Sequence, residues 1–191
     1  MDNYTLLGVA VVAAIVLLLV GGVVGWVFAR RQRTRRLRKQ FGAEYERLVN
    51  KVGDRREAED ELEARHQRVD SLDIRSLSSG EREHFIEAWQ VIQTRFVDEP
   101  ATAVKKAGQL ITEVMQTRGY PVAEFEQRAA DLSVGHADVV KHYRAARAIV
   151  NKNGQYEITT EELRQAMVHY RTLFAELVEV EDVEHKEAIS A

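Results

Sequence analysis

The hydrophobic pattern divides this chain sharply at residue 29. Residues 4–29 read YTLLGVAVVAAIVLLLVGGVVGWVFA, twenty-six residues without a charged side chain. A helix needs about 20 apolar residues to cross a hydrocarbon core of about 30 Å, and this run supplies about 39 Å at about 1.5 Å per residue. A buried helix of a soluble protein is rarely apolar on every face over such a length. The pattern therefore predicts a transmembrane helix over 4–29.

The start of the chain argues against a cleaved signal peptide. Such a peptide has a basic start, an apolar stretch of about 7–15 residues and a small-residue cleavage site. Here the start carries Asp2 and no Lys or Arg, and the longer apolar run ends in arginines. We therefore expect an uncleaved anchor.

A basic segment follows the apolar run, with seven basic residues among the ten of 30–39. Lys and Arg beside a membrane helix bias their flank to the cytoplasm, and residues 1–3 contain neither. We predict an N-terminus outside and a cytoplasmic C-terminal part, with anionic lipid contact worth about 1 kcal/mol per basic residue. The basic residues are Arg30, Arg31, Arg33, Arg35, Arg36, Arg38 and Lys39.

Small residues recur at a spacing of four within the apolar run, at Gly21, Gly25 and Ala29. This spacing places them on one helix face, where small side chains let two membrane helices approach closely. Glycine is also common in membrane helices that do not associate. The pattern therefore indicates a possible helix–helix packing face and self-association.

The apolar pattern thins to a narrow stripe after the basic segment. Phe41, Tyr45, Leu48 and Val52 recur at helical spacing, and a dense alternation of charge follows, DRREAEDELEARHQR over 54–68. We interpret 30–72 as the basic juxtamembrane segment plus one charged stalk helix. A short coiled coil is an alternative, although the heptad pattern fades after two to three turns.

Residues 73–178 show a periodicity typical of four to five amphipathic helices joined by short turns. Ser78 with Glu81, and Thr159 with Glu162, match the capping box that begins a helix. Pro100 suits a first helical turn. We expect a short helix over 122–130, a turn over 131–135, and an acidic, disordered tail over 179–191. The predicted fold class is all-α: a transmembrane helix, a stalk helix and a helical bundle.

Composition narrows the function classes. Cysteine is absent, which excludes disulfides, thiol catalysis and Cys-ligated zinc. The net charge of −3 conceals an asymmetry: residues 40–191 hold 20 basic and 29 acidic side chains, or −9. Nucleic acid is therefore a disfavoured partner of this part, and a basic protein is a better one.

Candidate chemistry in the sequence is sparse. Two E-x-x-H spacings, Glu63–His66 and Glu81–His84, resemble half-motifs of di-iron bundles, but chance produces such spacings in a chain with 30% charged residues. His142 shares a helix face with Asp138, without a nucleophile or phosphate loop beside it. Asp131, Arg128 and Arg144 are candidates for a buried polar cluster. We assign no catalytic residue, cofactor or metal.

Five segments of the chain have distinctive sequences: Phe41–Tyr45, Gly53–Arg56, Arg118–Pro121, Arg128–Ser133 and Thr160–Arg171. They resemble a family of bacterial hypothetical proteins with no assigned activity. Its members look like a single-pass membrane helix followed by a helical domain, and the similarity covers roughly 37–178. The resemblance implies a bacterial inner-membrane setting and transfers no functional residue.

Three functional hypotheses follow from the sequence. The first is a non-enzymatic, membrane-anchored interaction or scaffold protein whose partners are the lipid bilayer and another protein, or a second copy of itself. The second is a small helical enzyme or metal-binding bundle that uses His142 or His84. The third is anionic lipid or nucleic-acid contact through 30–39.

Overall fold

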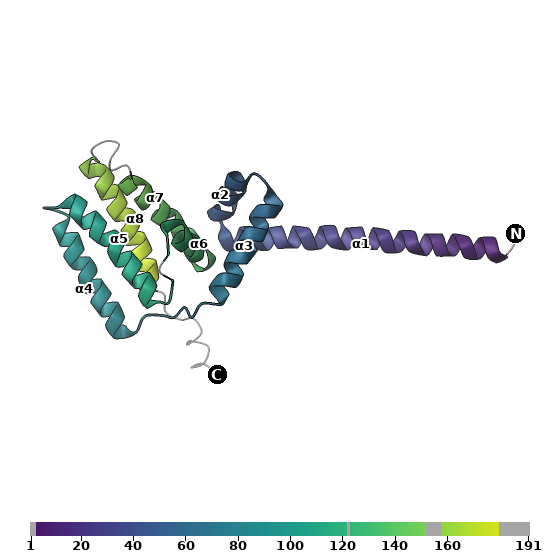
Figure 1. Cartoon of the computed structure of the whole chain (residues 1–191), viewed down its shortest axis with the longest axis horizontal. Coiled ribbons are helices and arrows are strands. Elements are labelled where there is room, and N and C mark those ends of the chain that lie inside the picture. Colours follow the sequence, from purple (N-terminus) through teal and green to yellow (C-terminus); the bar gives the residue numbers. More distant parts are fainter. Residues whose placement is uncertain (1–2, 122, 152–157, 180–191) are drawn as a thin grey trace. The chain divides into compact units, whose positions relative to one another are not determined.

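The computed structural model describes residues 3–121, 123–151 and 158–179, with side chains from residue 18 to residue 178 within these ranges (Figure 1). Every regular element in these ranges is an α-helix, which confirms the predicted all-α class. The chain divides into two compact units, residues 1–40 and 41–191. We call the second unit the head.

The first unit consists almost entirely of α1 (Asn3–Phe41), which continues without a break through the end of the apolar run and the basic segment. Arg38 and Lys39 lie in its last turn, where cations favourably oppose the partial negative charge of a helix C-terminus. Among the residues the structure describes, no helix combines the length and apolarity needed to cross a membrane.

The prediction of a single stalk helix is wrong. The chain instead forms two short helices, α2 (Ala43–Val52) and α3 (Arg55–Asp70), which pack against each other as the α2–α3 hairpin. Gly53 ends α2 with a φ of 82°, a left-handed conformation that glycine adopts without steric cost. The Asp54 carboxylate then caps α3 by accepting hydrogen bonds from two backbone amides at 2.8 and 2.9 Å.

The apolar stripe expected for a stalk is the buried face of this hairpin. Tyr45 and Leu48 of α2 and Leu62 of α3 are completely buried. The Tyr45 hydroxyl donates to Glu59 at 2.8 Å, which gives the buried phenol a polar partner. The hairpin in turn packs on the rest of the head, with α3 against α6 and α2 against α7.

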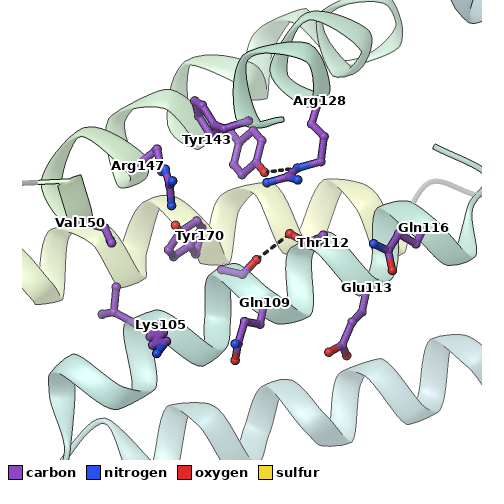
Figure 2. A pocket seen from close by; sticks show the side chains of 13 residues that line it. Lys105, Gln109, Thr112, Glu113, Gln116, Arg128, Tyr143, Arg147, Val150 and Tyr170 are labelled. Atoms are coloured by element: carbon purple, nitrogen blue, oxygen red, sulfur yellow. Dashed lines mark hydrogen bonds between the residues drawn. The ribbon is translucent and has the colours of Figure 1, made fainter. Parts of the chain in front are cut away.

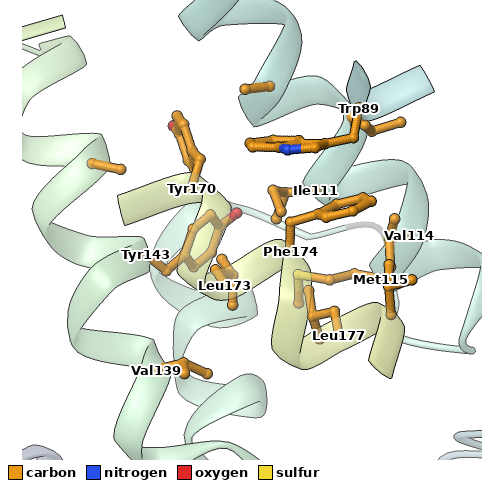
Figure 3. Packing of buried hydrophobic residues seen from close by; sticks show 14 of the residues in the cluster. Trp89, Ile111, Val114, Met115, Val139, Tyr143, Tyr170, Leu173, Phe174 and Leu177 are labelled. Atoms are coloured by element: carbon orange, nitrogen blue, oxygen red, sulfur yellow. The ribbon is translucent and has the colours of Figure 1, made fainter. Parts of the chain in front are cut away.

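Five helices of the described chain form the predicted bundle. They are α4 (Ser79–Arg95), α5 (Pro100–Thr117), α6 (Phe125–Gly135), α7 (Ala137–Asn151) and α8 (Thr160–Glu179). The last helix, α8, is central because it contacts α4, α5 and α7. Trp89 of α4 stacks on Phe174 of α8 with ring centroids 4.7 Å apart in the apolar core (Figure 3).

Both predicted capping boxes are present. Ser78 caps α4 reciprocally with Glu81, and Thr159 and Glu162 make the same pair of bonds before α8. The turn expected over 131–135 is wrong, because α6 continues to Gly135. The Asp131 side chain, which could have ended the helix by binding its backbone, is instead held by Arg68 and Gln127.

The segment 71–78 between the hairpin and the bundle is fixed to the end of α5. Arg75 and Arg118 bond each other's backbones, through an amide-to-carbonyl bond of 2.9 Å and a guanidinium-to-carbonyl bond of 3.2 Å. Gly119, with a φ of 98°, lies so close that a Cβ there would be 2.2 Å from the Asp73 carbonyl oxygen. The predicted acidic tail lies outside the described residues beyond Glu179.

Candidate functional site

A groove of about 570 Å³ runs along the bundle between α5 on one side and α6 and α7 on the other (Figure 2). Its α5 wall extends from Val104 to Gln116, about 18 Å at about 1.5 Å per residue. The volume lies within the usual range of about 300–1,000 Å³ for ligand sites. We call this hollow the α5–α7 groove.

The two walls of the α5–α7 groove differ in chemistry. The α5 wall presents mainly uncharged polar groups, including Gln109, Thr112 and Gln116, with Glu113 as its acid and Lys105 near one end. The opposite wall carries aromatic and cationic groups from α6 and α7: Phe125, Arg128, Tyr143 and Arg147. The groove therefore offers apolar surface and positive charge together.

The floor of the groove is formed where α5 crosses α8. Gly108 lies against Tyr170, and a Cβ at Gly108 would be 3.0 Å from the Tyr170 hydroxyl oxygen. Glycine thus lets the phenol reach the groove. Burial raises the pKa of Tyr170 to about 12, so its hydroxyl stays protonated and able to donate at neutral pH.

Two arginines of the α6–α7 wall are held in place by neighbouring aromatic rings. The Arg128 Nε donates to the Tyr143 hydroxyl at 3.1 Å, and its Nη1 donates to the carbonyl of Ala123. The Arg147 guanidinium lies 5.4 Å from the centre of the Phe125 ring, a cation–π distance. These contacts orient both cations without neutralising them.

The groove cations have no carboxylate partner. Lys105, Arg128 and Arg147 form no ion pair with any carboxylate of the described residues, although Glu113 lines the same groove. Six other arginines of the described head do pair with carboxylates, whereas Arg118 and Arg171, among others, do not. The six are Arg47, Arg65, Arg68, Arg75, Arg144 and Arg164. The groove therefore carries unpaired positive charge in a head that is acidic as a whole.

A second polar cluster joins the α2–α3 hairpin to the bundle. The buried Glu44 carboxylate accepts hydrogen bonds from Arg47 at 3.2 Å, Arg65 at 3.3 Å and Arg144 at 2.9 Å. Arg144 also pairs with Glu126 at 2.7 Å. Burial lowers the pKa of Arg144, but the hydrogen bonds and charges of Glu44 and Glu126 outweigh it and raise that pKa.

The predicted cluster of Asp131, Arg128 and Arg144 has a different arrangement. Asp131 accepts from Arg68 at 3.0 Å and from Gln127 at 2.9 Å, whereas Arg128 binds Tyr143 and Arg144 binds Glu44. Periodicity places all three on helices but cannot give the angular position of one helix against the next. The three residues consequently serve the hairpin interface and the groove separately.

The structure brings His142 together with a second histidine, His169, which lies 27 positions later in the chain. The Nδ1 atoms of His142 on α7 and His169 on α8 lie 2.9 Å apart, so one ring donates to the other. Burial, the charge of His169 and that of Lys141 lower the pKa of His142. If both rings were protonated, two N–H donors would face each other.

The E-x-x-H spacings are not assembled into a shared site. Glu81 caps α4 and pairs with Arg75, and His66 lies 3.2 Å from Asp70 on its own helix. Within the described ranges, no group of three or more His, Cys, Asp or Glu side chains is arranged to hold a metal ion.

The predicted membrane-proximal residues all lie on α1. The basic segment 30–39 occupies its C-terminal part, with Arg30 5.5 Å from the centre of the Trp26 ring. A Cβ at Gly21 or Gly25 would meet nothing within 4 Å, so this face of the described helix is open in the single chain. The sequence did not reveal the groove, because its lining comes from four helices whose relative rotation is not encoded locally.

The chain matches no protein-family model, no curated protein and no solved structure.

Proposed function

We propose that the chain is a membrane-anchored, non-enzymatic interaction protein whose head binds a partner protein in the α5–α7 groove. In this proposal, residues 4–29 span the bacterial inner membrane and the basic segment 30–39 holds the head on the cytoplasmic side. The long uncharged run and the one-sided basic flank support this topology.

The observation that carries the binding role is the groove itself. It combines aromatic surface with three cations that no described carboxylate neutralises. Lys105 and Arg147 are exposed and Arg128 is half-buried, so all three cations can be reached by a partner. A partner that places apolar and anionic or polar groups in the groove would complement both the aromatic surface and the cations.

The binding role is tested by site-specific photocrosslinking of the full chain in native membranes. A crosslinker at Gln109, which is exposed on the α5 wall, is expected to capture a discrete partner, and the same crosslinker at exposed Arg171 is not. Gly108→Leu, which fills the groove, should abolish the Gln109 adduct. The matched change Gly80→Leu, where a Cβ meets nothing within 4 Å, should preserve it. Equal adducts at both positions, or no effect of Gly108→Leu, would reject the groove as the binding site.

The proposed topology is tested separately with reporters fused after Ala191. A reporter that works only in the cytoplasm should be active, and one that works only in the periplasm should be silent. Activity of the periplasmic reporter would overturn the orientation. Self-association through the small-residue face is tested by Gly21→Ile combined with Gly25→Ile. An unchanged dimer signal in membranes would reject self-association through this face.

The alternative of a metal-binding or catalytic bundle has one supporting observation, the approach of His142 to His169. Titration of the full chain with Zn²⁺ or Cu²⁺ tests it. Metal binding that His142→Asn removes would favour this alternative. If neither the wild-type chain nor the variant binds metal, this alternative is rejected. The third candidate, lipid or nucleic-acid contact through 30–39, predicts binding that falls steeply with added salt.

A further inference from the structure

The outer face of α4 carries exposed apolar side chains beside a second hollow of the bundle. Val91 is 62% exposed and Ile86 is 39% exposed, although the same helix buries Trp89 in the core. A hollow of about 300 Å³ lies between α4 and α5, and Val91, Ile92 and Leu110 are its large apolar lining residues. We call it the α4–α5 hollow. This face leaves apolar surface uncovered in the single chain.

Charges of opposite sign lie at the two ends of the α4–α5 hollow. The short turn 96–99 reverses the chain, so α4 and α5 run antiparallel (Figure 1). Arg95, the last residue of α4, and Lys106, the first α5 residue of the lining, therefore lie at the end near the turn. Glu113, the last α5 residue of the lining, lies at the far end, and Glu87 lies about two turns before Arg95 on α4. The hollow is thus positive at one end, apolar in the middle and negative at the other end.

These four charged side chains have no ion-pair partner among the described residues. All four are exposed, and the ion pairs of the described head involve other residues. The acidic residues of the turn, Asp98 and Glu99, line the opposite side of α4 rather than the α4–α5 hollow. Both ends of the hollow can therefore pair with charges of another molecule.

A twofold axis at Val91 makes this face complementary to itself. Glu87 and Arg95 are each four positions from Val91, so an antiparallel second α4 places Glu87 of each copy opposite Arg95 of the other. The apolar middle of one copy then covers the apolar middle of the other. A second copy supplies both the reversed order of charges and the apolar surface by symmetry alone, which favours it over an unrelated partner.

We propose that the α4–α5 hollow is a self-association face, on which a second copy of this chain docks with its α4 antiparallel. This contact is distinct from the small-residue face of α1 and from the proposed partner site in the α5–α7 groove. It does not depend on the groove's role.

The absence of cysteine from the chain allows a direct test. Val91→Cys places the only thiol at the proposed axis, where identical residues of two copies meet as a symmetric disulfide requires. Oxidation of the full chain in native membranes is expected to give at least about fivefold more covalent dimer than Val168→Cys. The control position is also a valine, 49% exposed on α8. Equal yields, or no dimer from Val91→Cys, would overturn the proposal.

Charge reversal then tests the register of the two helices. In the Val91→Cys chain, Arg95→Glu should lower the dimer yield about tenfold, because it opposes Glu87 twice across the axis. Adding Glu87→Arg restores pairs of opposite sign and should return the yield to within about threefold. Arg171→Glu, an exposed change on α8, is expected to have no effect. Normal dimerisation of Arg95→Glu, or no recovery in the double exchange, would reject this face.

A photocrosslinker at Val91 identifies the occupant. An adduct of twice the chain's 21.8 kDa is expected. Adducts of other mass without this one would assign the face to a different protein and overturn self-association. Gln109 lines both the α4–α5 hollow and the α5–α7 groove, so the mass of its adduct separates the dimer from the groove's partner. Arg95→Glu should remove only the double-mass adduct of Gln109, and Gly108→Leu only the other.

Discussion

Glu44 shows how one buried charge is satisfied in the head. Its side chain is almost fully buried, and three arginines from three helices share its two oxygens. Burying a carboxylate is expensive, and the arrangement is stable only while the partners remain. The residue is therefore sensitive to changes that preserve its shape and remove its charge.

We predict that Glu44→Gln lowers the free energy of unfolding by about 3–5 kcal/mol, because Arg65 and Arg144 lose the anion that compensates them. Urea unfolding of the full chain measures this. The control is Glu161→Gln, which breaks the exposed pair with Arg164 and should cost less than about 1 kcal/mol. Similar losses in the two variants would show that Glu44 is not the centre of a buried network.

At the residue scale, the sequence identifies the charged positions but not their pairing. Glu44 and Arg144 are 100 positions apart, and no local spacing rule connects them. Local pairs are predictable when they obey helix geometry, as the i,i+4 pair of Glu61 with Arg65 does.

The short elements of the head depend on where the backbone turns. Gly53 and Gly119 both have positive φ, yet their surroundings differ. A Cβ at Gly53 meets nothing within 4 Å, whereas one at Gly119 would be 2.2 Å from the Asp73 carbonyl oxygen. The end of α2 can therefore accommodate a side chain that the end of α5 cannot.

We predict that Gly53→Ala costs about 1 kcal/mol of stability, the usual price of placing a side chain in the left-handed region. Gly119→Ala should cost clearly more, because segment 71–78 must move away from α5. Chemical denaturation of both variants gives the comparison. A smaller loss at Gly119 than at Gly53 would contradict the close contact between α5 and this segment.

The N-terminus of α4 provides a prediction about pH. Hydrogen bonds from Arg75 and Ser78 lower the pKa of Glu81 to about 2. Because the folded-state pKa lies below the ordinary value of 4.5, the stabilisation is complete above that pH and is lost as the pH falls through about 2. Arg75→Gln should raise the pKa of Glu81 toward its ordinary value, as NMR titration of the carboxyl carbon would show. An unchanged pKa would assign the effect to Ser78 alone.

At the element scale, the sequence was most informative at helix starts. The capping boxes at Ser78 and Thr159 and the proline at 100 begin α4, α8 and α5 as expected. The sequence was least informative at the predicted stalk helix, where the apolar stripe continues past Gly53 and is therefore typical of a single helix. Glycine weakens a helix by only about 1 kcal/mol, so whether it bends the chain is decided by tertiary packing.

At the scale of the whole molecule, the contacts that attach the α2–α3 hairpin to the bundle differ from those that hold the bundle helices together. The apolar cluster of the head comprises residues of α4–α8 and the adjoining segments, whereas the contacts between hairpin and bundle include the pairs Arg68–Asp131, Arg47–Glu126 and Arg144–Glu44. Salt screens the exposed pair Arg47–Glu126 strongly and the pairs of the buried carboxylates Glu44 and Asp131 more weakly, whereas it does not screen apolar packing. The two parts of the head should therefore respond differently to ionic strength.

We predict that hydrogen exchange of α2 and α3 accelerates with added salt while exchange of α5 and α8 does not. Arg68→Gln should produce the same selective acceleration at low salt, because it removes the main donor to buried Asp131. Arg164→Gln, which breaks an exposed pair on α8, is the control and should leave α2 and α3 unchanged. Uniform acceleration across all helices would mean that hairpin and bundle open as one unit.

The ionic attachment of the hairpin also has a mechanical consequence. In the membrane-anchored arrangement proposed above, tension between the bilayer and a captured partner enters the head at residue 41. Hydrogen-bonded ion pairs lose their energy over short displacements, so the hairpin would yield before the apolar core. If it also unravelled, residues 42–78 would add about 120 Å of extended chain, while the groove on α5–α8 stayed folded. The folded bundle would thus keep its bound partner while the unfolded hairpin lengthens the connection to the membrane.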